Sequence, residues 1–139
     1  MAKAQKILVT VDGSENAIRA LKFAISVNPP GTRLLVLFVQ APVPRSRAVS
    51  EALIEEHYSR QEELALSKAR KFLARTKTNA LIEVCIGDPA PTIVEYASKR
   101  KCTQIVMGNH GHGTLKGLFL GSVAMKVVQL ADVPVTLVK

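Results

Sequence analysis

The sequence lacks most of the features that small proteins use to cross-link a fold or to cross a membrane. Its two cysteines, Cys85 and Cys102, form neither a C-x-x-C pair nor part of a four-ligand zinc pattern, so both are expected to be buried thiols. No run of about 18 or more apolar residues occurs, which argues against a transmembrane helix. No apolar signal segment follows Met1, so we expect a soluble, cytoplasmic protein.

Aromatic residues are also scarce, at 4% of the chain, and tryptophan is absent. Proteins that bind RNA by base stacking need exposed aromatic side chains, so this scarcity weighs against nucleic-acid recognition. The formal net charge of +8 leaves a polyanion-binding role as one alternative. No acidic residue lies between Glu95 and Asp132, and therefore the C-terminal third is the part expected to attract an anion.

What the chain does contain is a regular alternation of short apolar runs and amphipathic segments. Strands are predicted at residues 6–11, 34–39, 81–86, 104–107 and 133–138. Helices are predicted between them, at roughly 14–28, 50–75, 91–100 and 122–130. This order predicts an α/β fold, with a mostly parallel sheet covered on both faces, in one domain spanning residues 1–139. Such sheets bind ligands beyond the carboxyl ends of their strands, where the strand order reverses.

The most informative segment connects the strand at 104–107 to a helix that Ser122 is expected to begin and cap. Its glycines permit positive φ angles and a close approach of the backbone to a ligand: Gly108, Gly111, Gly113, Gly117 and Gly121. Free N–H groups in such a loop, together with a helix N-terminus, form a cradle for phosphate, and the length of the segment favours several phosphates over one. A merely flexible surface loop is the alternative. Neither G-x-x-x-x-G-K-[ST] nor G-x-G-x-x-G is present.

The pattern Gly108-x2-Gly111-x9-Gly121-Ser122 resembles the G-x2-G-x9-G-[ST] signature of the ATP-binding branch of the universal stress protein family. The likeness extends along the chain, from KILVTVDGSE through GDPAPTIVEYA to ADVPVTLV. It implies a three-layer α/β/α fold with a five-stranded parallel sheet in the order 3-2-1-4-5. In that order the first and fourth strands lie side by side at the switch point.

The same resemblance implies a site for an adenine nucleotide, with ATP and a Mg²⁺ ion as the expected ligands. Adenine is expected near Thr10, Val11, Asp12 and Val39, and ribose near Asp12 and Gly108. The phosphates are expected to meet residues from both ends of the glycine-rich segment: Asn109, His110, Gly111, His112, Gly113, Thr114, Gly121, Ser122, Val123 and Ala124. The last strand, within Val133 to Val138, is expected to pair with its counterpart in a homodimer.

Several of these residues also have a plainer interpretation. Asp12 could simply cap the turn after the first strand. His110 and His112 could contact phosphate, bind a metal ion or remain solvated, and no Cys, Asp or Glu nearby completes a metal site. Lys116 could close on the phosphates or remain an exposed lysine.

The sequence therefore predicts a regulatory or stress-response protein that acts as a nucleotide-dependent switch. A slow ATPase or autokinase of the same fold is the alternative. Asp12 is the only acid assigned to the crevice, so no catalytic residue and no metal ion held by protein ligands are predicted.

Overall fold

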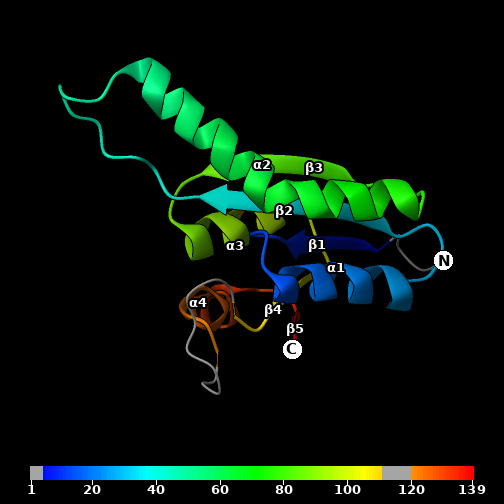
Figure 1. Ribbon diagram of the computed structural model, residues 1–139. Helices are drawn as coiled ribbons and strands as arrows, with labels where there is room; N and C mark the ends of the chain where they lie inside the picture. The colour runs from blue at the N-terminus through cyan, green and yellow to red at the C-terminus, as the bar shows by residue number, and fades with distance from the viewer. Residues whose placement is uncertain (1–4, 111–119) are drawn as a thin grey trace.

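The computed structural model describes residues 5–110 and 120–139. Helices and strands alternate in the predicted order: β1 (Lys6–Thr10), α1 (Glu15–Val27), β2 (Arg33–Gln40), α2 (Glu51–Arg75), β3 (Leu81–Ile86), α3 (Pro89–Lys99), β4 (Gln104–Gly108), α4 (Ser122–Leu130) and β5 (Val135–Val138). The strands form one parallel sheet in the order β3-β2-β1-β4-β5, with helices on both faces (Figure 1). The predicted α/β fold and the strand order implied by the resemblance are both confirmed.

The sheet separates two hydrophobic cores. On one face, α1 and α2 pack against strand residues that include Ile7, Val9 and Val36. On the other face, α3 and α4 pack against the alternate residues, such as Leu8 and Ile105. Because both faces are covered, the central strands are continuous apolar runs in the sequence rather than alternating polar and apolar residues.

The two cysteines lie on the α3 and α4 side of the sheet and are free thiols. Cys102 is buried as expected, whereas Cys85 is only half-buried because it lies on the edge strand β3. Burial raises the pKa of both thiols above the ordinary value, so neither is activated as a thiolate. No helix in the described ranges combines the length and the apolar composition that crossing a bilayer requires.

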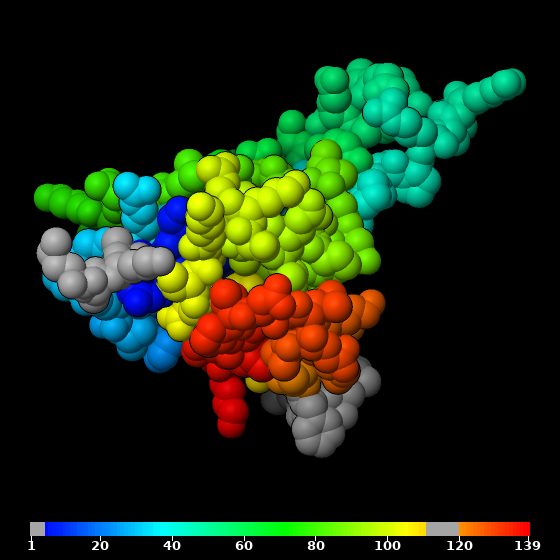
Figure 2. Space-filling view, turned by 180° about the vertical axis from the view of Figure 1, so that it is seen from behind, coloured from blue at the N-terminus to red at the C-terminus, as the bar shows by residue number. Residues whose placement is uncertain are grey.

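The first half of α2 and the loop at residues 41–50 stand away from the rest of the protein, as Figures 1 and 2 show from opposite sides. The loop is tied to the helix by the backbone N–H of Val43, which donates to the Tyr58 hydroxyl at 2.8 Å. Ser50 caps the helix by accepting a hydrogen bond from the backbone N–H of Leu53 at 3.2 Å. The helix carries exposed charged side chains, such as Glu56, which pairs with Arg60 at 3.0 Å.

Candidate functional site

A pocket of about 300 Å³ lies beyond the carboxyl ends of β1 and β4, where the strand order reverses. This is the position at which parallel α/β sheets bind their ligands. The pocket is lined by residues that come from several separate segments of the chain: Thr10, Val11, Asp12, Ser14, Ala17, Leu37, Val39, Pro89, Ile93, Met107, Gly108, His110, Gly121, Ser122, Val123 and Ala124.

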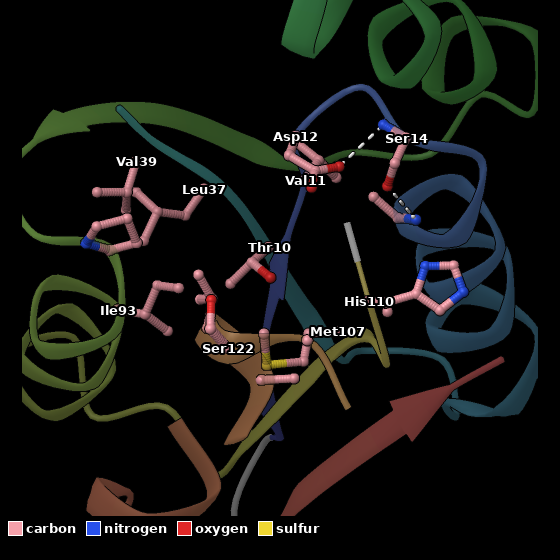
Figure 3. A pocket seen from close by; sticks show the side chains of 16 residues that line it. Thr10, Val11, Asp12, Ser14, Leu37, Val39, Ile93, Met107, His110 and Ser122 are labelled. Carbon is pink, nitrogen blue, oxygen red and sulfur yellow. Dashed lines mark hydrogen bonds between the residues drawn. The ribbon is translucent and has the colours of Figure 1, made fainter. Parts of the chain in front are cut away.

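The pocket has an apolar end and a polar end (Figure 3). Leu37 and Val39 of β2 face Ile93 of α3 at the apolar end. Asp12 and His110 lie toward the polar end. A ligand that combines a flat apolar ring with a polar part would match this division, because the ring would meet apolar side chains and the polar part would meet groups that can form hydrogen bonds.

Asp12 lies in the turn that connects β1 to α1. Its carboxylate oxygen Oδ1 accepts a hydrogen bond from the backbone N–H of Ser14 at 2.8 Å (Figure 3). The Ser14 hydroxyl in turn caps α1 by accepting from the N–H of Ala17 at 3.2 Å. Asp12 therefore does stabilise the turn, and it also lines the pocket.

The turn is packed tightly against the middle of α2. Gly13 has φ of +87°, a conformation that favours glycine, and a Cβ atom there would lie 2.6 Å from the carbonyl oxygen of Leu64. Lys68 of α2 also pairs with Glu15 at 2.9 Å, and this exposed pairing lowers the pKa of the Glu15 carboxyl. The position of Asp12 is thus fixed by α2 as well as by its own turn.

The N-terminus of α4 forms the opposite wall of the pocket. Ser122, Val123 and Ala124 are its first residues, and all three line the pocket. N–H groups at the start of a helix have no acceptor within the helix, and they carry the positive end of its dipole. The prediction that Ser122 caps this helix is wrong, because the N-cap is Gly121, which has no side chain to accept a hydrogen bond. The Ser122 hydroxyl is therefore not used in capping.

Asn109 connects the two ends of the glycine-rich segment instead of lining the pocket. Its carbonyl oxygen accepts from the N–H of Gly121 at 2.8 Å, and its own N–H donates to the carbonyl of Val138 at 2.9 Å. Its side-chain Oδ1 accepts from the amide of Asn16 at 2.6 Å. These bonds join the end of β4 to α1, α4 and β5.

The pocket brings together most of the residues predicted for the nucleotide: Thr10, Val11, Asp12, Val39, Gly108, His110, Gly121, Ser122, Val123 and Ala124. Asn109 is absent from the lining. Six residues of the glycine-rich segment named from the sequence lie outside the described ranges: Gly111, His112, Gly113, Thr114, Lys116 and Gly117.

Sequence reasoning missed six lining residues: Ser14, Ala17, Leu37, Pro89, Ile93 and Met107. Leu37 could have been found, because it lies two positions before Val39 and so faces the same side of β2. Pro89 and Ile93 carried no such signal, since their position over the pocket depends on how α3 packs against β2.

No three His, Cys, Asp or Glu side chains within residues 5–110 and 120–139 gather closely enough to hold a metal ion. Of the described residues that line the pocket, Asp12 and His110 are the ones that ionise. A cation at this site would therefore be coordinated largely by oxygens of its ligand and by water.

The whole chain is similar in sequence to known proteins. The universal stress protein family model matches residues 3–139. A universal stress protein of Methanocaldococcus jannaschii is 34% identical over 139 residues, which cover 97% of this chain and 82% of the relative. A universal stress protein of Thermus aquaticus is 38% identical over 137 residues, which cover 96% of this chain and 97% of the relative.

Solved structures show the same similarity in three dimensions. Universal stress protein UspA from Lactobacillus plantarum matches with a TM-score of 0.82 at 24% identity, over 100% of both chains. A universal stress protein in complex with cAMP matches with a TM-score of 0.72 at 25% identity, over 99% of both chains. The universal stress protein from Archaeoglobus fulgidus in complex with dAMP has a TM-score of 0.66 at 23% identity, over 100% of both chains.

Proposed function

The chain belongs to the universal stress protein family, and from this membership we propose that it binds an adenine nucleotide in the pocket beyond β1 and β4. One observation carries the proposal: the pocket brings Asp12, from the N-terminal part of the sequence, together with Gly108 and the N-terminus of α4. Structural neighbours solved with cAMP and dAMP support adenine as the base.

The two ends of the pocket support one orientation of the nucleotide. The adenine ring would lie at the apolar end, beside Val39 and Ile93, because a purine ring gains most by leaving water there. The phosphates would lie at the N-terminus of α4, where N–H groups and the Ser122 hydroxyl supply donors. Ribose would lie near Asp12 and Gly108, which also line the pocket.

Within this class of ligand we propose ATP accompanied by Mg²⁺. The G-x2-G-x9-G-[ST] pattern from Gly108 to Ser122 supports ATP. When bound, Mg²⁺ would neutralise part of the phosphate charge, and its ligands would be phosphate oxygens and water with Asp12 as the nearby acid.

We further propose that the protein is a cytoplasmic, nucleotide-dependent switch in the stress response, formed by one domain over residues 1–139. The pocket supplies groups suited to binding, such as the N–H donors of α4, and this favours binding over turnover. A homodimer through β5 is part of the same proposal, since β5 lies at the edge of the sheet.

Isothermal titration calorimetry on protein stripped of bound nucleotide tests the binding proposal. Mg-ATP, ADP, AMP and cAMP should be titrated in parallel, and saturable binding of at least one of them is expected. No heat of binding at millimolar ligand would overturn the proposal. Mass spectrometry of the small molecules released when the purified protein is denatured would identify the bound nucleotide independently.

Two variants localise the binding. Ser122→Ala removes a pocket hydroxyl that makes no hydrogen bond to the described residues, so it should weaken ATP binding about tenfold and leave stability within about 0.5 kcal/mol. Gly121→Val should abolish binding, because even a Cβ atom there would lie 3.1 Å from the Cα of His110. Phosphate release faster than that of Gly121→Val would instead support the slow-ATPase alternative.

A further inference from the structure

Asn16, near the start of α1, is a buried polar residue outside the pocket lining, with 3% of its surface exposed. Its amide nitrogen Nδ2 donates to Asn109 Oδ1 at 2.6 Å and to the carbonyl oxygen of Val138 at 3.0 Å. Its amide oxygen accepts from the Arg19 guanidinium at 2.6 Å. A buried amide is costly unless it is hydrogen-bonded, so this bonding holds one specific arrangement of α1, the end of β4 and the end of β5.

Asn109 links Asn16 to the start of α4 through hydrogen bonds. Three of its polar groups are engaged: the Oδ1 with Asn16, the N–H with Val138 and the carbonyl with the N–H of Gly121. Gly121 is the N-cap of α4, immediately before the helix residues that line the pocket. A continuous path of two hydrogen bonds therefore leads from Asn16 to the helix end proposed to bind phosphate.

The packing around this path leaves little room for adjustment. A Cβ atom on Gly108 would lie 2.9 Å from the Cβ of Asn16 and 3.1 Å from its backbone carbonyl carbon. A Cβ atom on Gly121 would lie 3.1 Å from the Cα of His110. Because there is little space beside either glycine for one added carbon atom, a displacement of Asn109 would be passed on to the N-terminus of α4.

We propose that Asn16 is a positioning residue for the nucleotide site, which fixes the N-terminus of α4 through Asn109 so that its N–H groups point at the phosphates. The inference rests on the proposed nucleotide binding. Asn16 does not line the pocket, so it acts on affinity through the geometry of Asn109 and Gly121 and not through contact with the ligand.

The test compares ATP with adenosine, which carries the same base and sugar without phosphates. Asn16→Ala removes the donor to Asn109 Oδ1 and one of the two donors to the Val138 carbonyl oxygen, which keeps its bond from the Asn109 N–H. It should weaken ATP binding at least tenfold, which corresponds to about 1.4 kcal/mol, and change adenosine binding less than about twofold. The ratio of the two dissociation constants is the readout, because a general loss of stability would weaken both ligands alike.

Two further variants control for structural damage. Leu21→Ala truncates a fully buried side chain of α1 in the core under α1 and α2. It should lower stability and leave the ratio of the ATP and adenosine dissociation constants unchanged. Asn109→Ala breaks the same path from the other side and provides a second test if Asn16→Ala does not fold. The double variant Asn16→Ala/Asn109→Ala should bind ATP no more than about twofold more weakly than Asn109→Ala alone, since both changes break one link.

The outcomes separate the two proposals. If the unaltered protein binds neither ATP nor adenosine, the proposed function fails and the inference fails with it. If it binds both, and Asn16→Ala and Asn109→Ala keep the ATP-to-adenosine ratio, nucleotide binding stands and the positioning role of Asn16 is wrong. Losses that multiply in the double variant would also overturn the role, because they would show that the two residues act independently.

Discussion

Gly13 and Gly31 share a left-handed backbone conformation, with φ of +87° and +90°, but their surroundings differ. A Cβ atom on Gly13 would lie 2.6 Å from the Leu64 carbonyl oxygen of α2, whereas one on Gly31 would meet nothing within 4 Å. We expect Gly31→Ala to lower the free energy of unfolding by about 1–2 kcal/mol through backbone strain alone. Gly13→Ala should cost about 1–3 kcal/mol more, because it adds a clash with a helix backbone.

Urea unfolding of both glycine variants, followed by circular dichroism, measures the difference. Gly31→Ala serves as the control for the φ angle. Equal losses in the two variants would show that the turn holding Asp12 has room beside α2, contrary to the packing described above.

Tyr96 gives stability a dependence on alkaline pH. Burial raises the pKa of its hydroxyl far above the ordinary value, and the Glu83 carboxylate adds to this shift. Although Glu83 is close, the hydroxyl has no hydrogen-bond partner of proper geometry in the described part of the chain. Below pH of about 10 both the folded and the unfolded chain keep the proton, so this group makes no difference to the pH dependence. Above it, only the unfolded chain releases the proton, and stability falls as the pH rises.

Tyr96→Phe should therefore reduce the loss of stability between pH 9 and 11, and at pH 8 it should change stability by less than about 1 kcal/mol. Unfolding free energies measured across this range test the prediction. Tyr58→Phe is the contrasting variant, since it removes the acceptor of the Val43 N–H bond and should cost stability at pH 8 as well. If the free energy of unfolding of Tyr96→Phe falls between pH 9 and 11 as much as that of the unaltered protein, other groups cause the loss of stability at alkaline pH.

At the scale of the helix, two serine caps of matched geometry have different surroundings. Ser14 of α1 and Ser50 of α2 each accept a backbone N–H at 3.2 Å. Replacing either with alanine should cost about 1 kcal/mol of stability. Only Ser14 lines the pocket, so only Ser14→Ala should also weaken nucleotide binding. Thermal unfolding and calorimetric titration of the two variants check both parts, and weaker binding in Ser50→Ala would contradict the assignment.

The elements themselves were largely predictable because each has a local signal. The run at Leu81–Ile86 was bounded correctly by its apolar residues and the Gly-Asp-Pro that follows. The helix α3 begins at Pro89, earlier than predicted, because a proline fits the first turn where its missing N–H is not needed. Strand β5 begins at Val135, later than predicted, after Pro134.

The site was predictable only in part. Asp12 and Ser122 stood out by their place next to strand and helix ends, and the resemblance supplied the strand order that puts them in one pocket. Ile93 could not be predicted, since no local pattern says which side of α3 reaches the ligand. The role of Asn16 could not be predicted either, because a polar residue in the first turn of a helix usually faces water. Two of its three partners, Asn109 and Val138, lie about a hundred residues away in sequence.

For the molecule as a whole, the edge of the sheet at β5 determines the expected assembly. In the described residues β5 pairs only with β4, and Figure 2 shows the C-terminal residues, in red, at the surface beside α4. An exposed edge strand is a template for pairing with another chain, so we expect a homodimer. Sedimentation velocity at micromolar concentration should give twice the chain mass of 15.0 kDa. A single species with the mass of one chain would contradict the dimer.

The pocket borders both hydrophobic cores. Val11 and Ala17 belong to the core under α1 and α2, whereas Ile93, Met107 and Ala124 belong to the core under α3 and α4. A molecule seated between them would touch both sides of the sheet, and opening either side would release it. Ligand at a hundred times its dissociation constant would add about 2.7 kcal/mol to the cost of any such opening. Amide hydrogen exchange would then slow together in the core under α1 and α2 and in the core under α3 and α4. The two cores would open as one cooperative unit.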